Sequence, residues 1–369
     1  MKSLFDSTDF SGLHLNNRFF RAATRDGFAD EQGHMTEELM HIYENLAKGG
    51  VGTIITGHAF VTDVEQSKQP GQMGIYNDSF IDEYKGFVKT VHDHGVKIIL
   101  QFSCIGAQTF SDAENLLTWG PSAVQDLATK VTPKEMTREE IQFLQLAFAD
   151  AALRAKRAGF DGVEIHAAHG YVLNKFLSPY YNKREDEYGG VFENRARMLR
   201  KTYEAIRWKV GSQYPVLVKI NCSDFMDDGL SFEDSKQVCK MLDKLGINGI
   251  EVSGGTLSSP KNSGPIRTDI EGKDPYFCQY AIEIAEEVSA PVILVGGNRD
   301  FDKMTELLNN SKIEYFSLCR PLIHEPDLIK RWKAGDLSAP KCISCNKCLG
   351  LKQTTCIFNR KKSNGDSTE

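Results

Sequence analysis

Short apolar runs alternate with longer amphipathic stretches along most of the chain. Eight of these runs, each five or six residues long, are rich in β-branched and aromatic side chains, a pattern that favours buried strands. The predicted strands cover Arg18–Ala23, Gly52–Gly57, Lys97–Phe102, Gly162–His166, Val216–Ile220, Gly249–Gly254, Val292–Gly297 and Tyr315–Cys319.

The intervening stretches show the apolar spacing of helices. They cover Glu37–Lys48, Asp78–Asp93, Arg138–Arg157, Asn194–Lys209, Phe232–Leu245, Phe277–Val288, Phe301–Asn309 and Glu325–Lys333. Strands that alternate with helices pair in parallel, and eight such units predict an α/β fold of the (β/α)₈ TIM-barrel type over residues 1–335. A doubly wound open sheet is the alternative, but no Gly-x-Gly-x-x-Gly fingerprint follows the first strand.

Composition narrows the class of function. The chain has 369 residues, 41% of them hydrophobic, and a net charge of -6, so it lacks the basic field of a nucleic-acid-binding protein. No apolar run approaches the roughly 20 residues of a membrane span, and the start lacks the apolar core of a signal peptide. We therefore expect a cytoplasmic enzyme without nucleic-acid or membrane partners. Its subunit number stays open, a homo-oligomer included.

Polar side chains gather where the predicted strands end, which is where barrel enzymes build their active sites. Glycines follow the seventh strand and an arginine follows the eighth, the two places where such barrels commonly bind phosphate. An amide on strand three and a cation on strand five suit the pyrimidine edge of a flavin and the charge that builds near its N1. The residues concerned are Gln101, His166, His169, Tyr171, Lys219, Gly296, Gly297 and Arg320.

One long motif at the end of strand four carries a specific resemblance. The stretch "HAAHGYVLNKFLSPYYNKREDEYGGVFENRARM", with "LNNRFFRAATRDG", "ILQFSCIGAQ", "VLVKINCSDF", "VGGNRD" and "CRPLIHEPDL", resembles the old yellow enzyme family over roughly residues 1 to 335. The resemblance implies an FMN-dependent ene-reductase. In this family NAD(P)H reduces the flavin, which passes hydride to the β-carbon of an alkene conjugated to a carbonyl-type group.

The resemblance also assigns roles to individual residues. It implies flavin-ring contacts from Gln101 and Lys219, ring neighbours at Thr24 and Gly57, and phosphate contacts from the glycines and the arginine named above. His166 and His169 would donate hydrogen bonds to the substrate carbonyl oxygen, where charge develops. Tyr171 would protonate the α-carbon. The expected substrate is a small unsaturated carbonyl or enoyl-type compound, with the physiological alkene and the choice between NADH and NADPH left open.

Two other interpretations of the histidine pair compete with this one. The pair could bind zinc with Glu164 or Asp161, which would make the protein a metal-dependent hydrolase or lyase on the same fold. Such a site needs ligands from further strand ends, and strands five to seven supply few. Alternatively, both histidines could be satisfied structural residues.

The chain departs from the family pattern at several positions. Many relatives read Gln-Leu-x-His-x-Gly-Arg after strand three, whereas this chain runs from Gln101 to Ala107 without that histidine or arginine. Lys219 replaces the more usual arginine and loses its bidentate fork. Arg25 stands at a position facing the flavin where relatives often carry Thr, Cys or His. It would raise the flavin potential, bind an acidic substrate group, or only pair with Asp26 or Glu31.

The C-terminal segment 336–369 carries four cysteines, Cys342, Cys345, Cys348 and Cys356, separated by two, two and seven residues. The run is typical of iron–sulfur ligation, here a 4Fe–4S cluster, although zinc and unligated thiols stay open. Its position resembles the 2,4-dienoyl-CoA reductase branch, but the spacings are shorter. We expect no second flavin or nucleotide domain after it, so a cluster would serve a separate electron-transfer partner. The polar stretch 359–369 is predicted to be disordered.

Overall fold

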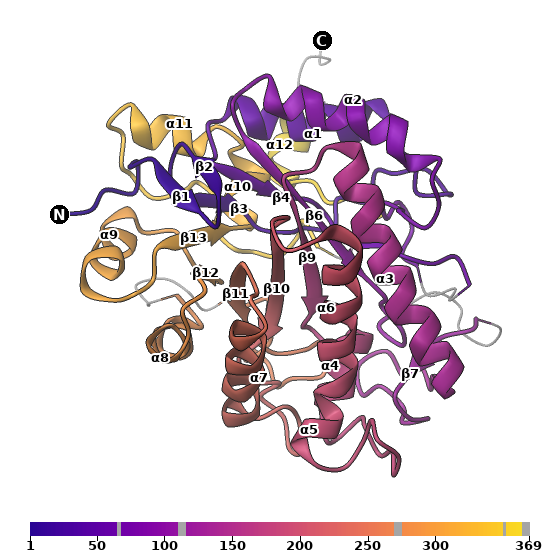
Figure 1. Cartoon of the computed structure of the whole chain (residues 1–369). Helices are drawn as coiled ribbons and strands as arrows, with labels where there is room; N and C mark the ends of the chain where they lie inside the picture. The colour runs from indigo at the N-terminus through magenta and orange to yellow at the C-terminus, as the bar shows by residue number, and fades with distance from the viewer. Residues whose placement is uncertain (65–67, 110–115, 269–274, 350–351, 364–369) are drawn as a thin grey trace.

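Eight parallel strands close into a barrel at the centre of the protein (Figure 1). The computed structural model describes residues 1–64, 68–109, 116–268, 275–349 and 352–363. Each barrel strand pairs with the next around the ring, and the pairing of β4 with β6 completes the circle. The strands are β3 (Phe19–Arg21), β4 (Thr53–Ile55), β6 (Lys97–Ser103), β9 (Gly162–Ala167), β10 (Val216–Asn221), β11 (Gly249–Ser253), β12 (Val292–Val295) and β13 (Tyr315–Leu318). The predicted TIM barrel and its eight strands are confirmed.

Helices surround the barrel, and all eight predicted ones are present; α1 has the predicted ends and the other seven are shifted at one or both ends. The longest, α3, begins with a capping box between Thr137 and Glu140 and ends at Gly159, whose φ of 95° suits a residue without a Cβ. The set comprises α1 (Glu37–Lys48), α2 (Phe80–His92), α3 (Arg138–Ala158), α6 (Arg197–Val210), α7 (Phe232–Lys244), α8 (Cys278–Glu287), α9 (Phe301–Asn310) and α11 (Leu328–Lys333). None of the described helices is both long and apolar enough to span a bilayer.

A hairpin of β1 (Thr8–Phe10) and β2 (Leu13–Leu15) packs against the end of the barrel where the strands begin. The Phe10 ring lies 5.4 Å from that of Phe20 and 5.0 Å from that of Tyr315, centroid to centroid. These rings join apolar side chains from the starts of other strands in one buried cluster. The site must therefore lie at the opposite end of the barrel.

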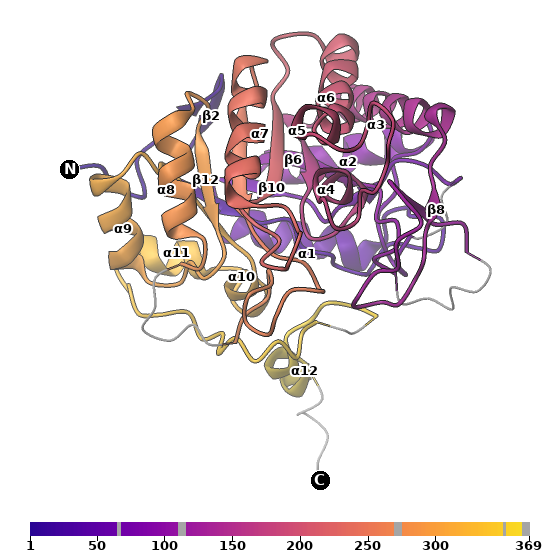
Figure 2. The same cartoon turned by 90° about the horizontal axis from the view of Figure 1, so that it is seen from below.

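Short elements decorate the loops at that opposite end. They are β5 (Ala59–Phe60), β7 (Trp119–Gly120), β8 (Lys134–Glu135), α4 (Val172–Leu177), α5 (Phe192–Arg195), α10 (Arg320–His324) and α12 (Ile357–Ser363). Figure 2 shows the C-terminal segment, in yellow, running past α10 to α12. α12 includes residues 359–363 of the stretch predicted to be disordered, residues 364–369 lie outside the described part of the chain, and the disorder of this stretch stays a prediction.

The charged residues of the long motif build a scaffold. The Lys175 ammonium lies 2.9 Å from the Asp126 carboxylate, and both side chains are almost fully buried. Asp126 also accepts a hydrogen bond from the Gln108 amide, whose own oxygen has no hydrogen-bond partner within the described part of the chain. Arg184 and Asp186 form an ion pair through two contacts of 2.9 and 2.6 Å. The first pair joins α4 to the loop between β7 and β8, and the second stabilises the loop that follows α4.

Replacing Lys175 with Met should destabilise the protein by about 3–5 kcal/mol, because it leaves the Asp126 carboxylate buried without a counterion. The double variant Lys175→Met, Asp126→Asn should recover most of that loss, since the Gln108 amide can turn its free oxygen toward the new NH₂ group. Chemical denaturation measures both free energies of unfolding. A double variant as unstable as the single one would contradict this explanation.

Candidate active site

The barrel interior changes from apolar to polar along its axis. Above the apolar cluster at the hairpin end lies a buried layer of four polar side chains. The Gln101 amide donates to Glu164 at 2.6 Å, and the Lys219 ammonium lies 2.7 Å from Glu251. Because successive side chains of a strand point to opposite faces, the next side chains that point into the barrel form its rim. They include His166, Ser253 and Ser317.

Within this polar layer, Lys219 and Glu251 form an ion pair. Burial and the nearby Glu251 carboxylate raise the pKa of Glu164 well above its usual value, which favours the neutral form of this carboxyl. Burial alone would lower the pKa of Lys219, but attraction by Glu251 and Glu164 more than offsets it, and the net shift is upward. A permanent cation therefore sits directly beneath the rim.

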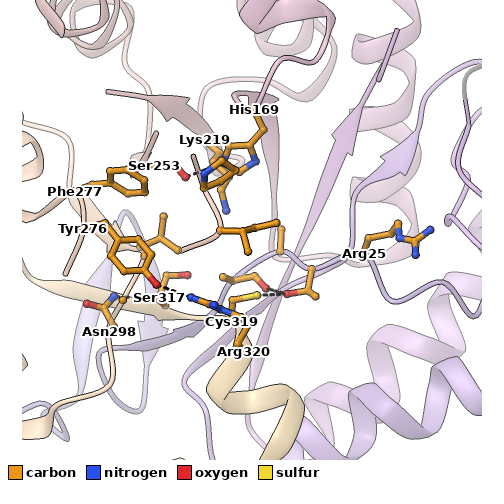
Figure 3. Close-up of a pocket in the computed structure, with 18 of the residues that line it drawn as sticks. Arg25, His169, Lys219, Ser253, Tyr276, Phe277, Asn298, Ser317, Cys319 and Arg320 are labelled. Atoms are coloured by element: carbon orange, nitrogen blue, oxygen red, sulfur yellow. Dashed lines mark hydrogen bonds between the residues drawn. The ribbon is translucent and has the colours of Figure 1, made fainter. Parts of the chain in front are cut away.

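A cavity of about 1140 Å³, counting the part open to solvent, opens above this layer. It is elongated. Figure 3 shows Arg25 on one side of it and Tyr276, Asn298 and Arg320 on the other, with Lys219 and His169 between them. The cavity collects side chains from the ends of most barrel strands, and it contains all the residues predicted for the site except Gly57 and the four cysteines.

One end of the cavity has the features of an anion site. Gly296 and Gly297 adopt φ values of 97° and 87°, which L-residues with a side chain rarely adopt. Arg299 and Arg320 line the same end, with the Arg320 guanidinium 2.5 Å from the Tyr276 hydroxyl. The Oδ1 of Asn298 and the Oγ of Ser317 are buried there without a hydrogen-bond partner among the described residues. An anionic group here would face both arginines and could accept from the Ser317 hydroxyl, whereas Asn298 Oδ1, an acceptor, requires a donor such as a ligand hydroxyl.

The part of the cavity wall that carries His169 is built by the turn that follows β9. His169, at a φ of 60°, and Gly170 reverse the chain before α4. The His169 N–H donates to Asn221 Oδ1 at 3.1 Å, and the Gly170 N–H donates to Asn174 Oδ1 at 2.7 Å. Both asparagines donate to the same oxygen of the buried Asp224. This network fixes the turn, and sequence reasoning gave no role to Asn174 or Asp224.

Two predicted imidazoles face the cavity in defined states. The Ala168 N–H donates to His166 Nδ1 at 3.2 Å, so the proton of the neutral ring is on Nε2. Burial lowers the pKa of both His166 and His169 well below the usual value, and the neutral forms dominate near pH 7. His169 Nε2 lies 2.8 Å from the Ser253 hydroxyl. His166 can therefore donate a hydrogen bond without carrying charge.

Tyr171 stands beside a third histidine that sequence reasoning missed. The Tyr171 oxygen lies 3.2 Å from His58 Nε2, and the rings of His58, His166 and Tyr171 contact one another. Burial raises the pKa of Tyr171 to about 12, against the opposing effects of Arg25 and a hydrogen bond from the Gln69 side chain. The only sequence signal was the position of His58, directly after the second strand.

Thr24 and Gly57, the two predicted neighbours of the flavin ring, border different cavities. Thr24 lines the cavity, where its hydroxyl lies 3.1 Å from the Cys319 sulfur. Gly57 instead borders a smaller adjoining cavity, and its N–H donates to the Tyr43 hydroxyl at 2.7 Å. Arg25 lines both cavities, and its guanidinium donates to the carbonyl oxygen of Lys352 at 3.3 Å. The side chain next to the main cavity at this strand end is His58.

The proposed metal ligands do not assemble. Asp161 lies at the start of β9 and binds His92 and Lys97, far from the rim, while Glu164 hydrogen-bonds to Gln101. Cys342, Cys345, Cys348 and Cys356 line one small pocket of about 320 Å³ that shares Arg320 with the main cavity. In the described part of the chain, no three His, Cys, Asp or Glu side chains come together closely enough to hold a metal ion. The hydrolase or lyase interpretation thus has no ligand set here.

Comparison with known proteins points to one family. The profile described as "NADH:flavin oxidoreductase / NADH oxidase family" matches residues 3–337. An NADH oxidase from Thermoanaerobacter brockii is 34% identical over 353 residues, which are 94% of this chain and 54% of the relative. The chain therefore spans about half the length of that curated relative.

Two solved structures share the fold. A 2-naphthoyl-CoA reductase in complex with 2-naphthoyl-CoA superposes with a TM-score of 0.89 at 26% identity, covering 98% of this chain and 57% of that one. An old yellow enzyme homologue from Zymomonas mobilis gives a TM-score of 0.79 at 25% identity and covers 97% and 98% of the two chains. The resemblance found in the sequence is confirmed at the level of family and fold.

The buried imidazoles should make the protein acid-sensitive. An unfolded histidine takes up a proton below about pH 6.5, whereas folded His58 resists protonation until its lowered pKa of about 3. Stability is therefore full above about pH 6.5 and falls as the pH drops, by up to about 1.4 kcal/mol per pH unit for each buried imidazole.

We expect His58→Gln to reduce this slope, measured as the free energy of unfolding between about pH 6.5 and 4.5. The same replacement at His41, which is exposed on α1, provides the control and should leave the slope unchanged. Equal slopes for His58→Gln and the wild type would contradict the assignment of a neutral, buried His58.

Proposed function

The chain belongs to the NADH:flavin oxidoreductase / NADH oxidase family, and from that premise we propose that it is an FMN-dependent reductase of activated carbon–carbon double bonds. The observation that carries the proposal is the juxtaposition, in one cavity, of an anion site, a buried cation and neutral hydrogen-bond donors. NAD(P)H is the proposed reductant, and an alkene conjugated to a carbonyl-type group is the proposed acceptor.

The residues of the cavity fit FMN. The glycine and arginine end suits the phosphate, and the partnerless oxygens of Asn298 and Ser317 lie where a polar ligand would satisfy them. Gln101 and Lys219 form the floor that would meet the pyrimidine edge, although both are also bound to carboxyl groups below. When bound, FMN accepts hydride from NAD(P)H and passes it to the β-carbon of the acceptor.

The imidazoles would activate the substrate. His166 carries its proton on Nε2, the nitrogen not occupied by the Ala168 N–H, and can donate to a carbonyl oxygen that gains negative charge as hydride arrives. His169 contributes its ring beside it, held by Ser253. Because this neutral donor is already in position before the reaction, the site needs no reorganisation when negative charge develops on the carbonyl oxygen.

Tyr171 would supply the proton that completes the reduction. Its high pKa keeps the phenol protonated throughout the neutral range, so a proton is available for the α-carbon. The positive charge of Arg25 lowers the pKa of this phenol and would stabilise the phenolate left behind. Hydride on the β-carbon and this proton on the α-carbon together give the saturated product.

The substrate class follows from the cavity and from one relative. Arg25 lies at the end of the cavity away from the anion site, so an acidic or otherwise polar group on the substrate would find a cation there. The reductase solved with 2-naphthoyl-CoA supports enoyl-type thioesters as candidates alongside simple enones. We propose an unsaturated carbonyl or enoyl-type compound.

The organisation of the chain is a proposal of the same kind. Residues 1–335 would form the FMN barrel and 336–369 a cysteine-rich extension. As the thiols are placed, they do not form a ligand set, so no step is assigned to a metal there. A 4Fe–4S cluster stays a prediction that rests on the spacing of the four cysteines, and it would imply a separate electron-transfer partner.

Half-reaction kinetics test the proposed function. Protein loaded with FMN should lose its yellow colour anaerobically with NADH or NADPH and regain it when an enone is added. Tyr171→Phe should slow the recovery by about 10²- to 10⁴-fold, the usual worth of a general acid, while the bleaching rate stays the same. The function would be wrong if the protein does not bind FMN, or if only oxygen restores the colour.

Iron and acid-labile sulfide in anaerobically purified protein test the cluster. If the four thiols bind it, iron should be present and a broad visible absorbance should disappear in Cys345→Ser. A matched replacement of the buried Cys239, in α7 away from the tail, should leave both unchanged. Stoichiometric zinc, or metal-free protein with the four thiols titratable, would contradict the prediction.

A further inference from the structure

His58 contacts the oxygen from which the proposed reaction takes its proton. Its Nε2 lies 3.2 Å from the Tyr171 oxygen, and its ring lies edge-on to the phenol at a centroid distance of 5.2 Å. The side chain is buried in the wall of the main cavity. Which of the two atoms is the donor depends on the tautomer of His58.

Gln72 determines that tautomer. The backbone N–H of Gln69 can only donate, and it lies 2.9 Å from Gln72 Oε1. The carbonyl oxygen of His58 can only accept, and it lies 3.1 Å from Gln72 Nε2. These two contacts fix the orientation of the amide independently of each other. The group that faces His58 Nδ1, at 2.9 Å, is therefore the NH₂ of Gln72.

An NH₂ group requires an acceptor, so Nδ1 of His58 is unprotonated. The Ser103 hydroxyl, 3.0 Å from the same nitrogen, can donate to it as well. Burial, together with the charges of Arg25 and Lys219, lowers the pKa of His58 to about 3, so the ring is neutral near pH 7. Its single proton is then on Nε2, and it points at the Tyr171 oxygen.

We propose that Gln72 and His58 are positioning residues that reserve the phenol proton of Tyr171 for the substrate. When the Tyr171 oxygen accepts a hydrogen bond from His58 Nε2–H, its own hydrogen is free to turn toward the cavity. After that proton has moved to the α-carbon, the phenolate retains the Nε2–H donor, the bond from Gln69 and the field of Arg25. With the opposite tautomer, His58 would accept the phenol hydrogen and compete with the substrate for it.

This inference rests on the proposed function, but one test does not. Nitrogen NMR of protein labelled with ¹⁵N-histidine should show the His58 proton coupled to Nε2, with assignment by its loss in His58→Leu. In Gln72→Leu the preference for Nε2 should weaken. A proton on Nδ1 in the wild type would overturn the inference, whatever the enzyme proves to reduce.

Kinetics test the consequence. His58→Leu should slow reoxidation of the reduced flavin by an enone roughly 10- to 100-fold, the usual worth of a hydrogen bond to a charged group. Flavin reduction by NAD(P)H should not change. His58→Gln keeps an N–H donor of similar reach and should recover much of the rate. His41→Leu, a replacement of an exposed histidine, is the matched control and should behave like the wild type.

A double variant distinguishes a positioning role of His58 from general damage to the structure. In the Tyr171→Phe background, the phenol is absent and His58→Leu should have no further effect on reoxidation. An equal loss in both backgrounds, or equal losses in both half-reactions, would mean that His58 acts only through the structure, and would overturn the proposal. If an enone fails to reoxidise the reduced wild type, the proposed function fails, and the NMR result alone decides the arrangement of His58.

Discussion

The buried ion pair between Lys219 and Glu251 is the constraint on which the rim of the barrel depends. The two residues are direct partners in the register of β10 with β11, and Lys219 is also level with His166 on β9. A charge in this interior costs several kcal/mol unless it is paired, and a slip of one residue would turn the side chains to the other face. The pair therefore fixes the register of β10 with β11, and with it the rim position of Ser253.

Most of the hydrogen-bond donors at this rim of the barrel are neutral. His58, His166 and His169 are uncharged because they are buried, and Tyr171 keeps its proton for the same reason. The cations at this end, Lys219 below and Arg25 to the side, lie where negative charge would develop on the flavin or on the phenolate. Burial thus has two effects at once: it sets the protonation state of each donor and strengthens the electrostatic effect of each cation.

The sequence allowed the barrel to be predicted because each strand is a continuous apolar run, and the barrel in turn brings the strand ends together. Gln101, His166, Lys219 and Arg320 line one cavity for that reason alone. Gly57 and His58 show the limit: of these adjacent residues after a strand, only His58 reaches the main cavity, and the path of the loop decides which one does. Likewise, the role of Gln72 depends on two backbone contacts that no sequence pattern encodes. The four tail cysteines line one small pocket, and the cluster that their spacing predicts stays a prediction.

The position at which hydride arrives tests the central claim most directly. A conjugated enone should be reduced with a nicotinamide cofactor that carries deuterium at its transferable position, and the product analysed by NMR. If the imidazoles hold the carbonyl oxygen above a flavin at this rim, the deuterium will be found on the β-carbon and the carbonyl will be intact. Deuterium on the carbonyl carbon, or no reduction by flavin-loaded protein, would contradict the account.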